Sequence, residues 1–257
     1  MHRLMSGLAL VLSLALGACH DPAGPQPVGS NVNDSRVPDD LRALYREDAA
    51  RLALRELQAQ PGGYGDIAIS AELIETYYAA LVQVFNADGL SARDTVVDVY
   101  RIHTFGQPET HRLLLQAAAD QAWVQRLVNG ELPTGNARVD RLLEDYGLSL
   151  DWKYPLSTSN EMLIVLRAAD ALNVAALAHL FDGVAGLRYS EPDGMAGDGN
   201  DIRALRGAPI LLDYSVGYGD CPAGCIARRT YHFAVHADGT VEYLGASGSP
   251  PPNLPQP

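Results

Sequence analysis

Oxygen-bearing side chains gather in a glycine-rich stretch of the second half of the chain. Residues 193–203 read DGMAGDGNDIR, in which Asp198, Asn200 and Asp201 supply two carboxylates and an amide. Ca2+ prefers oxygen ligands of this kind, so these three residues form a candidate calcium site. The EF-hand pattern is not met, because Ile202 stands where the third ligand belongs. A solvated turn that uses Asn, Asp and Gly for their backbone freedom explains the same residues, and the sequence favours that turn.

Two cysteines and two histidines near the C-terminus offer sulfur and nitrogen ligands. Cys221 and Cys225 have the spacing C-x3-C, and His232 and His236 lie four residues apart in a stretch that alternates like a strand. Both histidines then point to one face, so the four side chains could form a Cys2His2 zinc site. Alternation alone explains the histidines, since Tyr231, Phe233 and Val235 fill the inner face and leave the imidazoles in water. A redox-active cysteine pair is disfavoured because the spacing is not C-x2-C.

Familiar catalytic spacings are absent from the chain. The sequence contains no G-x-S-x-G, no Walker loop, no H-E-x-x-H and no dinucleotide glycine fingerprint. Ser and His residues are present, but a catalytic triad need not show in sequence spacing. The acid pair Glu144-Asp145 is typical of a solvated helix face. The sequence therefore identifies no catalytic residue, and it favours a non-catalytic role over an enzymatic one.

The N-terminus resembles the signal of a bacterial lipoprotein. The sequence MHRLMSGLALVLSLALGAC has a short basic start and an apolar run over residues 8–16, which is too short for an ordinary membrane-spanning helix. The LGAC that ends at Cys19 resembles a lipobox. The resemblance implies removal of residues 1–18 as a signal peptide and attachment of diacylglyceryl to the Cys19 sulfur. An ordinary secretory signal with a chance cysteine is the alternative.

The lipobox resemblance implies a place in the bacterial cell envelope, in the periplasm or at the cell surface, with the membrane as a partner through the lipid anchor. Such a compartment is oxidising. If Cys19 carries lipid, Cys221 and Cys225 remain as a pair, and a disulfide between them is expected. Residues 19–37 are rich in Pro, Gly, Ser and Asn, so we expect a flexible tether there.

A second resemblance lies around the cysteine loop. The stretch GDCPAGCI, with the aromatic strand and the D-G-x-V turn that follow it, resembles a GDCPxGC motif of uncharacterised secreted proteins and lipoproteins of bacteria. The likeness extends upstream through the Gly-Asp-Gly-Asn-Asp segment. It implies an extracytoplasmic location and the pairing of Cys221 with Cys225, and it assigns no catalytic residue.

Hydrophobic spacing predicts helices in the N-terminal part of the chain. The first covers residues 38–60 and stops at Pro61, and Ser70 caps a second. The β-branched stretch TVVDVYRIHT predicts a strand over residues 95–104. The expected elements that follow are a strand at 112–118, helices at 121–128 and 137–146, and a strand at 148–154.

Residues 161–181 are compatible with two secondary-structure predictions. They could form one long buried helix, or a strand, a turn and a helix opened by Asn173 as N-cap. With the strand LRYSEP that follows, the second alternative resembles the end of a subtilisin-type propeptide over residues 173–193, with a Gly-Val turn at Gly183. The resemblance implies a βαβ-like unit and, as an alternative function, a protease-inhibitor-like module.

The C-terminal part predicts an antiparallel meander. Strands are expected at 209–216, 229–235 and 241–244, and Asp238-Gly239 is typical of the tight turn of a hairpin. We therefore predict an α+β fold with N-terminal helices, a βαβ-like unit and this meander. The expected organisation is one globular domain at 38–247, with a helical part at 38–90, a mixed part at 91–192, a meander at 208–247, and a disordered tail at 248–257.

The net charge of −12 over 257 residues argues against nucleic acid as a partner, because nucleic-acid binding needs basic surface. The apolar fraction of 47% supports a real hydrophobic core. Together with the anchor, these features favour an envelope lipoprotein that binds a protein or a small molecule. An extracytoplasmic hydrolase with dispersed catalytic residues is the alternative.

Overall fold

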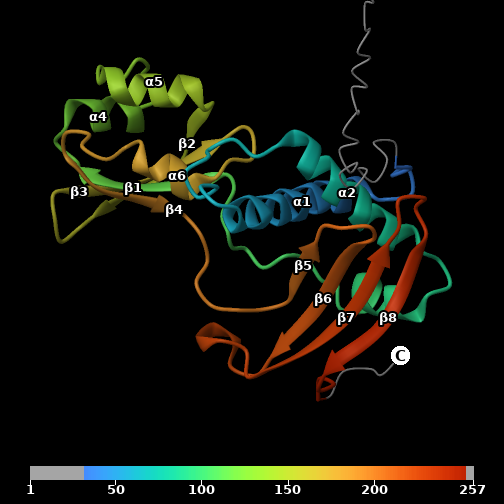
Figure 1. The fold of residues 1–257 in the computed structure, drawn as a ribbon. Helices are drawn as coiled ribbons and strands as arrows, with labels where there is room; N and C mark the ends of the chain where they lie inside the picture. Colours follow the sequence, from blue (N-terminus) through green and yellow to red (C-terminus); the bar gives the residue numbers. More distant parts are fainter. Residues whose placement is uncertain (1–31, 253–257) are drawn as a thin grey trace, which may run out of the picture.

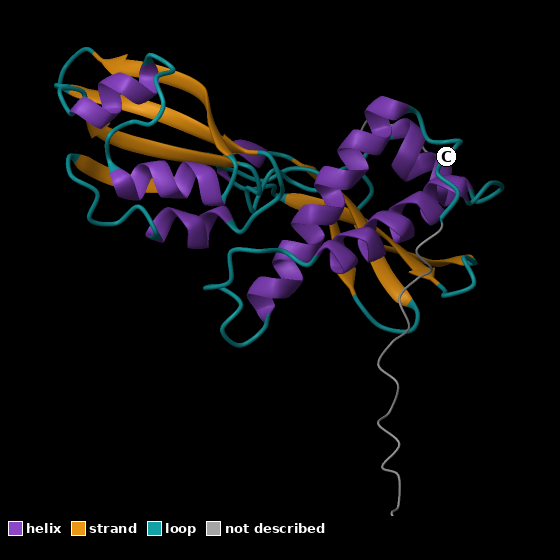
Figure 2. Ribbon diagram, turned by 90° about the horizontal axis from the view of Figure 1, so that it is seen from above, coloured by secondary structure: helices purple, strands orange, loops and turns teal. Residues whose placement is uncertain are grey.

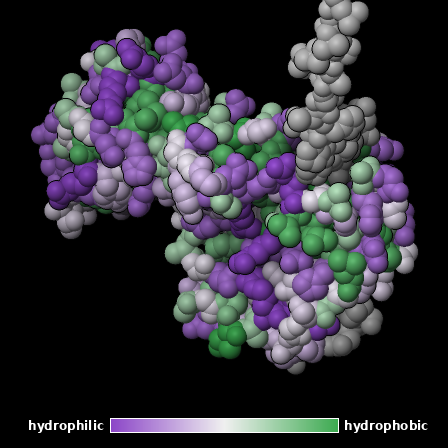
Figure 3. Space-filling view, in the orientation of Figure 1, coloured by the Kyte–Doolittle hydropathy of each residue, from purple (hydrophilic) through white to green (hydrophobic). Residues whose placement is uncertain are grey.

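The structure, a computed structural model, describes residues 32–252, which form two lobes (Figure 1, Figure 3). Each lobe has its own hydrophobic core and its own four-stranded antiparallel sheet. Residues 32–100 and 201–252 build what we call the helix–sheet lobe, and residues 112–192, inserted between them, build the inserted lobe. The predicted α+β class, with N-terminal helices and a C-terminal antiparallel sheet, is confirmed.

Two long helices pack on the sheet of the helix–sheet lobe. α1 (Asp39–Ala59) carries Asp39 and Asp40 in its first turn, where carboxylates favour the positive end of the helix dipole. α2 (Ala71–Asn86) is capped by Ser70, whose Oγ accepts a hydrogen bond from the backbone amide three residues later at 3.3 Å. The structure confirms both predicted helices and the Ser70 cap.

The sheet beneath these helices has the strand order β5-β6-β7-β8. Its strands are β5 (Asp201–Leu205), β6 (Ile210–Tyr218), β7 (Ala227–Val235) and β8 (Val241–Gly248). Inward-facing aromatic rings join the strands, and Tyr214 meets Phe233 edge-on with ring centroids 5.5 Å apart. The predicted meander is confirmed, although β5 precedes it and β8 runs beyond Leu244 to Gly248.

The predicted strand over residues 95–104 is wrong. α3 (Ser91–Asp94) continues into a π-helical turn, η1 (Thr95–Val99), whose first two residues are buried. The Arg93 guanidinium lies 2.5 Å from the Asp98 carboxylate five residues later, a spacing that suits a π turn. Burial and this ion pair outweigh the β-propensity of the segment, which depends strongly on context.

The inserted lobe is a four-stranded sheet with helices against one face (Figure 2). Its elements are β1 (Arg112–Ala118), α4 (Ala122–Val128), α5 (Ala137–Asp145), β2 (Leu148–Leu156), β3 (Glu161–Ala168), α6 (Val174–His179) and β4 (Leu187–Pro192). The strand order is β2-β3-β1-β4, so β3 and β4 run parallel with β1 between them. This confirms the predicted βαβ-like unit as a split βαβ, and the whole lobe has the ferredoxin-like arrangement.

Of the two structures predicted for residues 161–181, the strand followed by a helix is confirmed. Asn173 caps α6 by accepting a hydrogen bond from the Ala176 amide at 3.4 Å. Its Nδ2 also donates to the Asp66 carbonyl at 2.9 Å, in the loop after α1. This fully buried amide therefore ties the inserted lobe to the helix–sheet lobe.

The described chain begins within the segment expected to be a tether. Val37 is buried, and the Tyr78 hydroxyl donates to the Asp34 carboxylate at 2.6 Å. Burial of that hydroxyl and its bond to Asp34 raise the pKa of Tyr78 to about 12. Residues 33–37 thus belong to the folded body, whereas the predicted signal at 1–18, Cys19 and the end of the tail, 253–257, lie outside the described residues.

Candidate functional site

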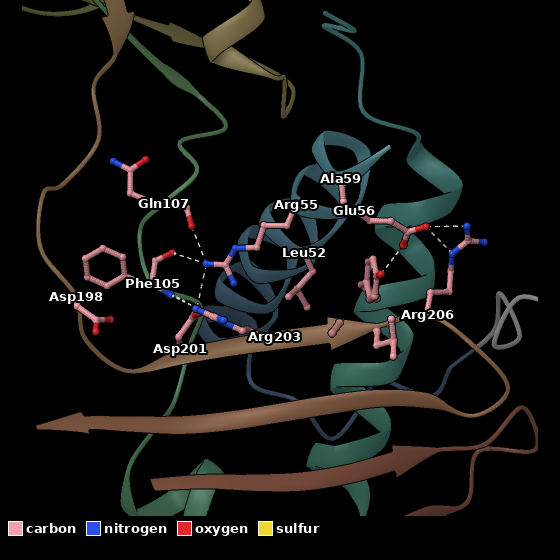
Figure 4. Close-up of a pocket in the computed structure, with 13 residues that line it drawn as sticks. Leu52, Arg55, Glu56, Ala59, Phe105, Gln107, Asp198, Asp201, Arg203 and Arg206 are labelled. Atoms are coloured by element: carbon pink, nitrogen blue, oxygen red, sulfur yellow. Dashed lines mark hydrogen bonds and ion pairs between the residues drawn. The ribbon is translucent and has the colours of Figure 1, made fainter. Parts of the chain in front are cut away.

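A cleft of about 660 Å3 opens between α1 and β5, beside the two connections to the inserted lobe (Figure 4). Its volume lies in the range of small-molecule and peptide pockets. Its wall combines apolar side chains with three arginines and three carboxylates; the lining residues are Leu52, Arg55, Glu56, Ala59, Tyr77, Phe105, Gln107, Asp198, Asp201, Arg203, Ala204, Leu205 and Arg206. We call this site the β5 cleft.

Arg55 of α1 organises one end of the β5 cleft. Its guanidinium donates to the Ile202 carbonyl at 2.7 Å, to the Gln107 carbonyl at 2.6 Å and to Asp201 Oδ1 at 3.0 Å. The Phe105 amide also donates to Asp201 Oδ1, at 2.8 Å. Figure 4 shows these groups converging from α1, β5 and the segment that leads to the inserted lobe. A single ion pair therefore joins three stretches of chain.

Glu56 and Arg206 form the other end. The Arg206 guanidinium contacts Glu56 Oε1 at 2.7 and 2.8 Å, and the Tyr77 hydroxyl donates to Glu56 Oε2 at 2.5 Å. Burial, reinforced by the bond to Glu56, raises the pKa of Tyr77 well above its ordinary value. The same carboxylate raises the pKa of Arg206. Tyr77 thus stays neutral and Arg206 stays charged at neutral pH.

A second cleft of about 300 Å3 continues beyond this ion pair. Glu56 and Arg206 line both cavities, and Gln60, Ser70 and Ile210 are among the further residues of the second. The two cavities therefore meet at this ion pair, and the second lies between the end of α1, the start of α2 and the turn after β5. Such a shape suits an elongated ligand.

β5 presents an unpaired edge to the β5 cleft. Within residues 32–252, β5 pairs only with β6 and is the first strand of its sheet. Because the Ile202 carbonyl accepts from Arg55, the main-chain groups of Ile202 point away from β6. Ala204, two residues on, has the same orientation, so its amide and carbonyl also point away from β6, and the residue lines the cleft. Backbone groups exposed in this way are ready to pair with another extended chain.

The three candidate calcium ligands each take protein partners. Asp198 lies 2.5 Å from the Arg228 guanidinium, Asn200 Oδ1 accepts from the Gly217 amide at 3.2 Å, and Asp201 binds Arg55. In the described part of the chain, no group of three or more His, Cys, Asp or Glu is arranged to hold a metal ion. The glycine-rich loop thus anchors arginines, and Asp198 and Asp201 enter the cleft wall.

The cysteine and histidine side chains are not brought together as a zinc site. Cys221 and Cys225 lie at disulfide distance, so their sulfurs are committed to each other. His236 lies 3.8 Å from Glu242, and His232 hydrogen-bonds to side chains of its own sheet. The residues predicted to fill the inner face, Tyr231, Phe233 and Val235, are buried.

Sequence reasoning missed most of the β5 cleft. Arg55 and Glu56 look like ordinary exposed positions of an amphipathic helix, and their partners lie up to 150 residues away. Among the residues that bind Arg55, only Asp201 is identified as a candidate site residue by its local sequence. Pairings across such distances need the fold before they can be recognised.

Comparisons of the chain with known protein families, curated proteins and solved structures found no match. No helix within residues 32–252 is long and apolar enough to cross a membrane. Function is therefore inferred from the chemistry of the chain itself.

We expect Asp198→Asn to destabilise the protein at neutral pH and to have less effect in acid. Hydrogen bonds from Arg228 and from the Gly199 and Cys225 amides hold the pKa of Asp198 below its ordinary value. A lowered folded-state pKa adds stability above about pH 4, where the unfolded carboxyl is ionised, and this stability is lost as the pH falls through the folded value. Because the Asp198 side chain is 38% exposed and partly screened, urea unfolding at pH 7 should show a loss of about 1 kcal/mol.

The matched control is Asp220→Asn, an exposed carboxylate in the next loop. It should change the free energy of unfolding little at either pH. If Asp198→Asn lowered the free energy of unfolding by the same amount near pH 2 as at pH 7, the stabilising role of the ionised Asp198 carboxylate would be contradicted.

Proposed function

We propose that this chain is a membrane-anchored lipoprotein of the bacterial envelope that binds an extended polypeptide segment in the β5 cleft. The observation that carries the binding proposal is the unpaired edge of β5, which faces a cleft of about 660 Å3. Addition of a strand to an exposed sheet edge is a common mode of peptide recognition.

The anchor is proposed from the sequence alone. The LGAC that ends at Cys19 supports lipid attachment, and the residues after it are rich in Pro and Gly. Two or three acyl chains hold a protein on a membrane stably, whereas one holds it only marginally. The acidic net charge of −12 makes electrostatic adhesion to anionic lipid unfavourable, so the lipid would supply the attachment.

The chemistry of the cleft favours binding over catalysis. Its three carboxylates, Glu56, Asp198 and Asp201, each contact an arginine, so none is free to act as a general base. The apolar wall includes Leu52, Ala59 and the ring of Tyr77. A site of this kind holds a ligand by apolar contact and by backbone pairing.

The cleft also defines what the bound segment should carry. Ala204 would exchange hydrogen bonds with the peptide backbone, and an apolar side chain of the peptide would enter beside Leu52 and Ala59. Arg203 has a side chain that is 79% exposed and shares Asp201 with Arg55. Its charge is thus only partly balanced, which favours a carboxylate on the ligand.

Loss of the anchor should release the protein from the membrane. Cells that express Cys19→Ser should yield the protein in the aqueous phase of a detergent partition, whereas the unaltered chain should enter the detergent phase. The control replaces both Cys221 and Cys225 by Ser, which keeps Cys19 and should leave the partition unchanged. Detergent partition of the Cys19→Ser protein would refute the lipid anchor.

Filling the cleft should abolish peptide binding. Ala59 is an exposed residue of α1 that lines the cleft, so Ala59→Trp places a large ring where the peptide would lie. Ala43 is also exposed on α1 and is not among the cleft residues, so Ala43→Trp is the matched control. In an array of synthetic decapeptides, those bound by the unaltered protein and by Ala43→Trp should bind Ala59→Trp about ten-fold more weakly or worse. Failure of every peptide to bind, or equal binding by Ala59→Trp, would overturn the proposal.

A further inference from the structure

The outer face of the C-terminal sheet brings together an aspartate, a histidine and a serine from three adjacent strands. His232 Nδ1 lies 2.7 Å from Asp213 Oδ1, and His232 Nε2 lies 2.8 Å from Ser247 Oγ. Asp213 is the direct cross-strand neighbour of His232, and Ser247 pairs with Thr230, two residues before it. Side chains two residues apart share a face, so all three lie on the side away from the buried Tyr231 and Phe233.

These contacts have the connectivity of a nucleophile, a general base and the group that orients the base. The carboxylate on Nδ1 favours the tautomer with its proton there, which leaves the Nε2 lone pair directed at the serine hydroxyl. Both distances fall within the range required for proton transfer between such groups. The hydrogen bond from His232 to Ser247 distinguishes this group from a simple Asp213–His232 ion pair.

The surroundings leave room for a substrate beside the imidazole. Gly245 stands directly across from His232, and a Cβ added there would meet no atom within 4 Å. The side chains of His232 and Asp213 are 32% and 46% exposed, so the group is reached from solvent without a deep pocket. A shallow site of this kind admits small or extended esters and provides little discrimination among acyl groups.

A developing oxyanion at Ser247 needs hydrogen-bond donors, and an edge strand offers backbone amides. β8 is the last strand of its sheet and pairs only with β7 among the described residues. Alternate backbone amides of an edge strand point away from its neighbour. Along β8, either the Ser247 amide or the amides of Ala246 and Gly248 therefore point away from β7, next to the Ser247 hydroxyl.

We propose that Asp213, His232 and Ser247 form a hydrolytic site for solvent-accessible carboxylic esters. Ser247 Oγ attacks the ester carbonyl carbon while its proton passes to His232 Nε2. The bond from that carbon to the alcohol oxygen breaks, and the same proton goes to the departing alcohol. Water, deprotonated by His232, then cleaves the acyl-serine and returns the proton to Ser247, so ester and water give acid and alcohol. Asp213 stays ionised throughout and holds the imidazole in place.

This site is independent of the peptide-binding proposal. Ser247 lies on β8, three strands from β5, which is about 14 Å across the sheet at the usual strand spacing. None of the three residues lines the β5 cleft. Failure of one proposal therefore leaves the other standing.

The test uses a fluorophosphonate probe, which forms a phosphorus–oxygen bond with an activated serine and releases fluoride, together with hydrolysis of p-nitrophenyl acetate. Mass spectrometry of the full chain should locate the probe on Ser247. Ser247→Ala should abolish labelling and reduce ester hydrolysis by about 100-fold or more, as should His232→Gln, whereas Asp213→Asn should reduce both by at least about ten-fold.

Ser249→Ala, at a serine two residues away, is the matched control and should leave labelling and hydrolysis unchanged. An exposed histidine alone can cleave p-nitrophenyl acetate slowly, so hydrolysis that survives Ser247→Ala would overturn the proposal. Absence of labelling at Ser247 in the unaltered protein would overturn it as well. Thermal unfolding midpoints within a few degrees of the unaltered protein, expected for surface substitutions, ensure that each loss reflects the site.

Discussion

The arrangement of this protein depends on one partly buried guanidinium, that of Arg55. A charged group removed from water is costly unless its donors are satisfied, and the donors of Arg55 are met by Asp201 and by the Gln107 and Ile202 carbonyls. These acceptors lie on the first connection to the inserted lobe, at Gln107, and at the start of β5. The same interactions that satisfy the charge therefore fix the position of β5 relative to α1, and with it the width of the β5 cleft.

The C-terminal sheet separates three roles by strand edge and by face. Its inner face packs Tyr214 and Phe233 against the helices, its first edge at β5 lines the cleft, and its outer face carries the Asp213–His232–Ser247 group. Alternation along β7 makes this possible, because a one-residue step moves a side chain from the core to the solvent. The two proposed activities therefore do not conflict structurally, because the peptide would bind at one edge of the sheet and the ester would be cleaved on its outer face.

Local signals predicted the parts of the fold that local chemistry decides. The caps at Ser70 and Asn173 and the meander around Asp238-Gly239 follow from backbone donors and turn geometry within a few residues. The strand predicted over residues 95–104 is wrong because burial and the Arg93–Asp98 pair hold its β-branched residues in a π turn. The candidate sites could not be predicted from the sequence for a related reason. Partners such as Arg55 and Asp201 are 146 residues apart, and only the sheet register brings Asp213 to His232.

The claim that Arg55 and Asp201 jointly frame the cleft is tested most directly by a double-mutant cycle on the free energy of unfolding. Arg55→Met, Asp201→Asn and the double variant would be unfolded in urea beside the unaltered protein. The account predicts that each single substitution costs about 3 kcal/mol and that the double costs at least about 1.5 kcal/mol less than their sum, because the second change removes a charge already left without its partner. Costs that add to within about 0.5 kcal/mol would contradict it, since independent sites behave in that way.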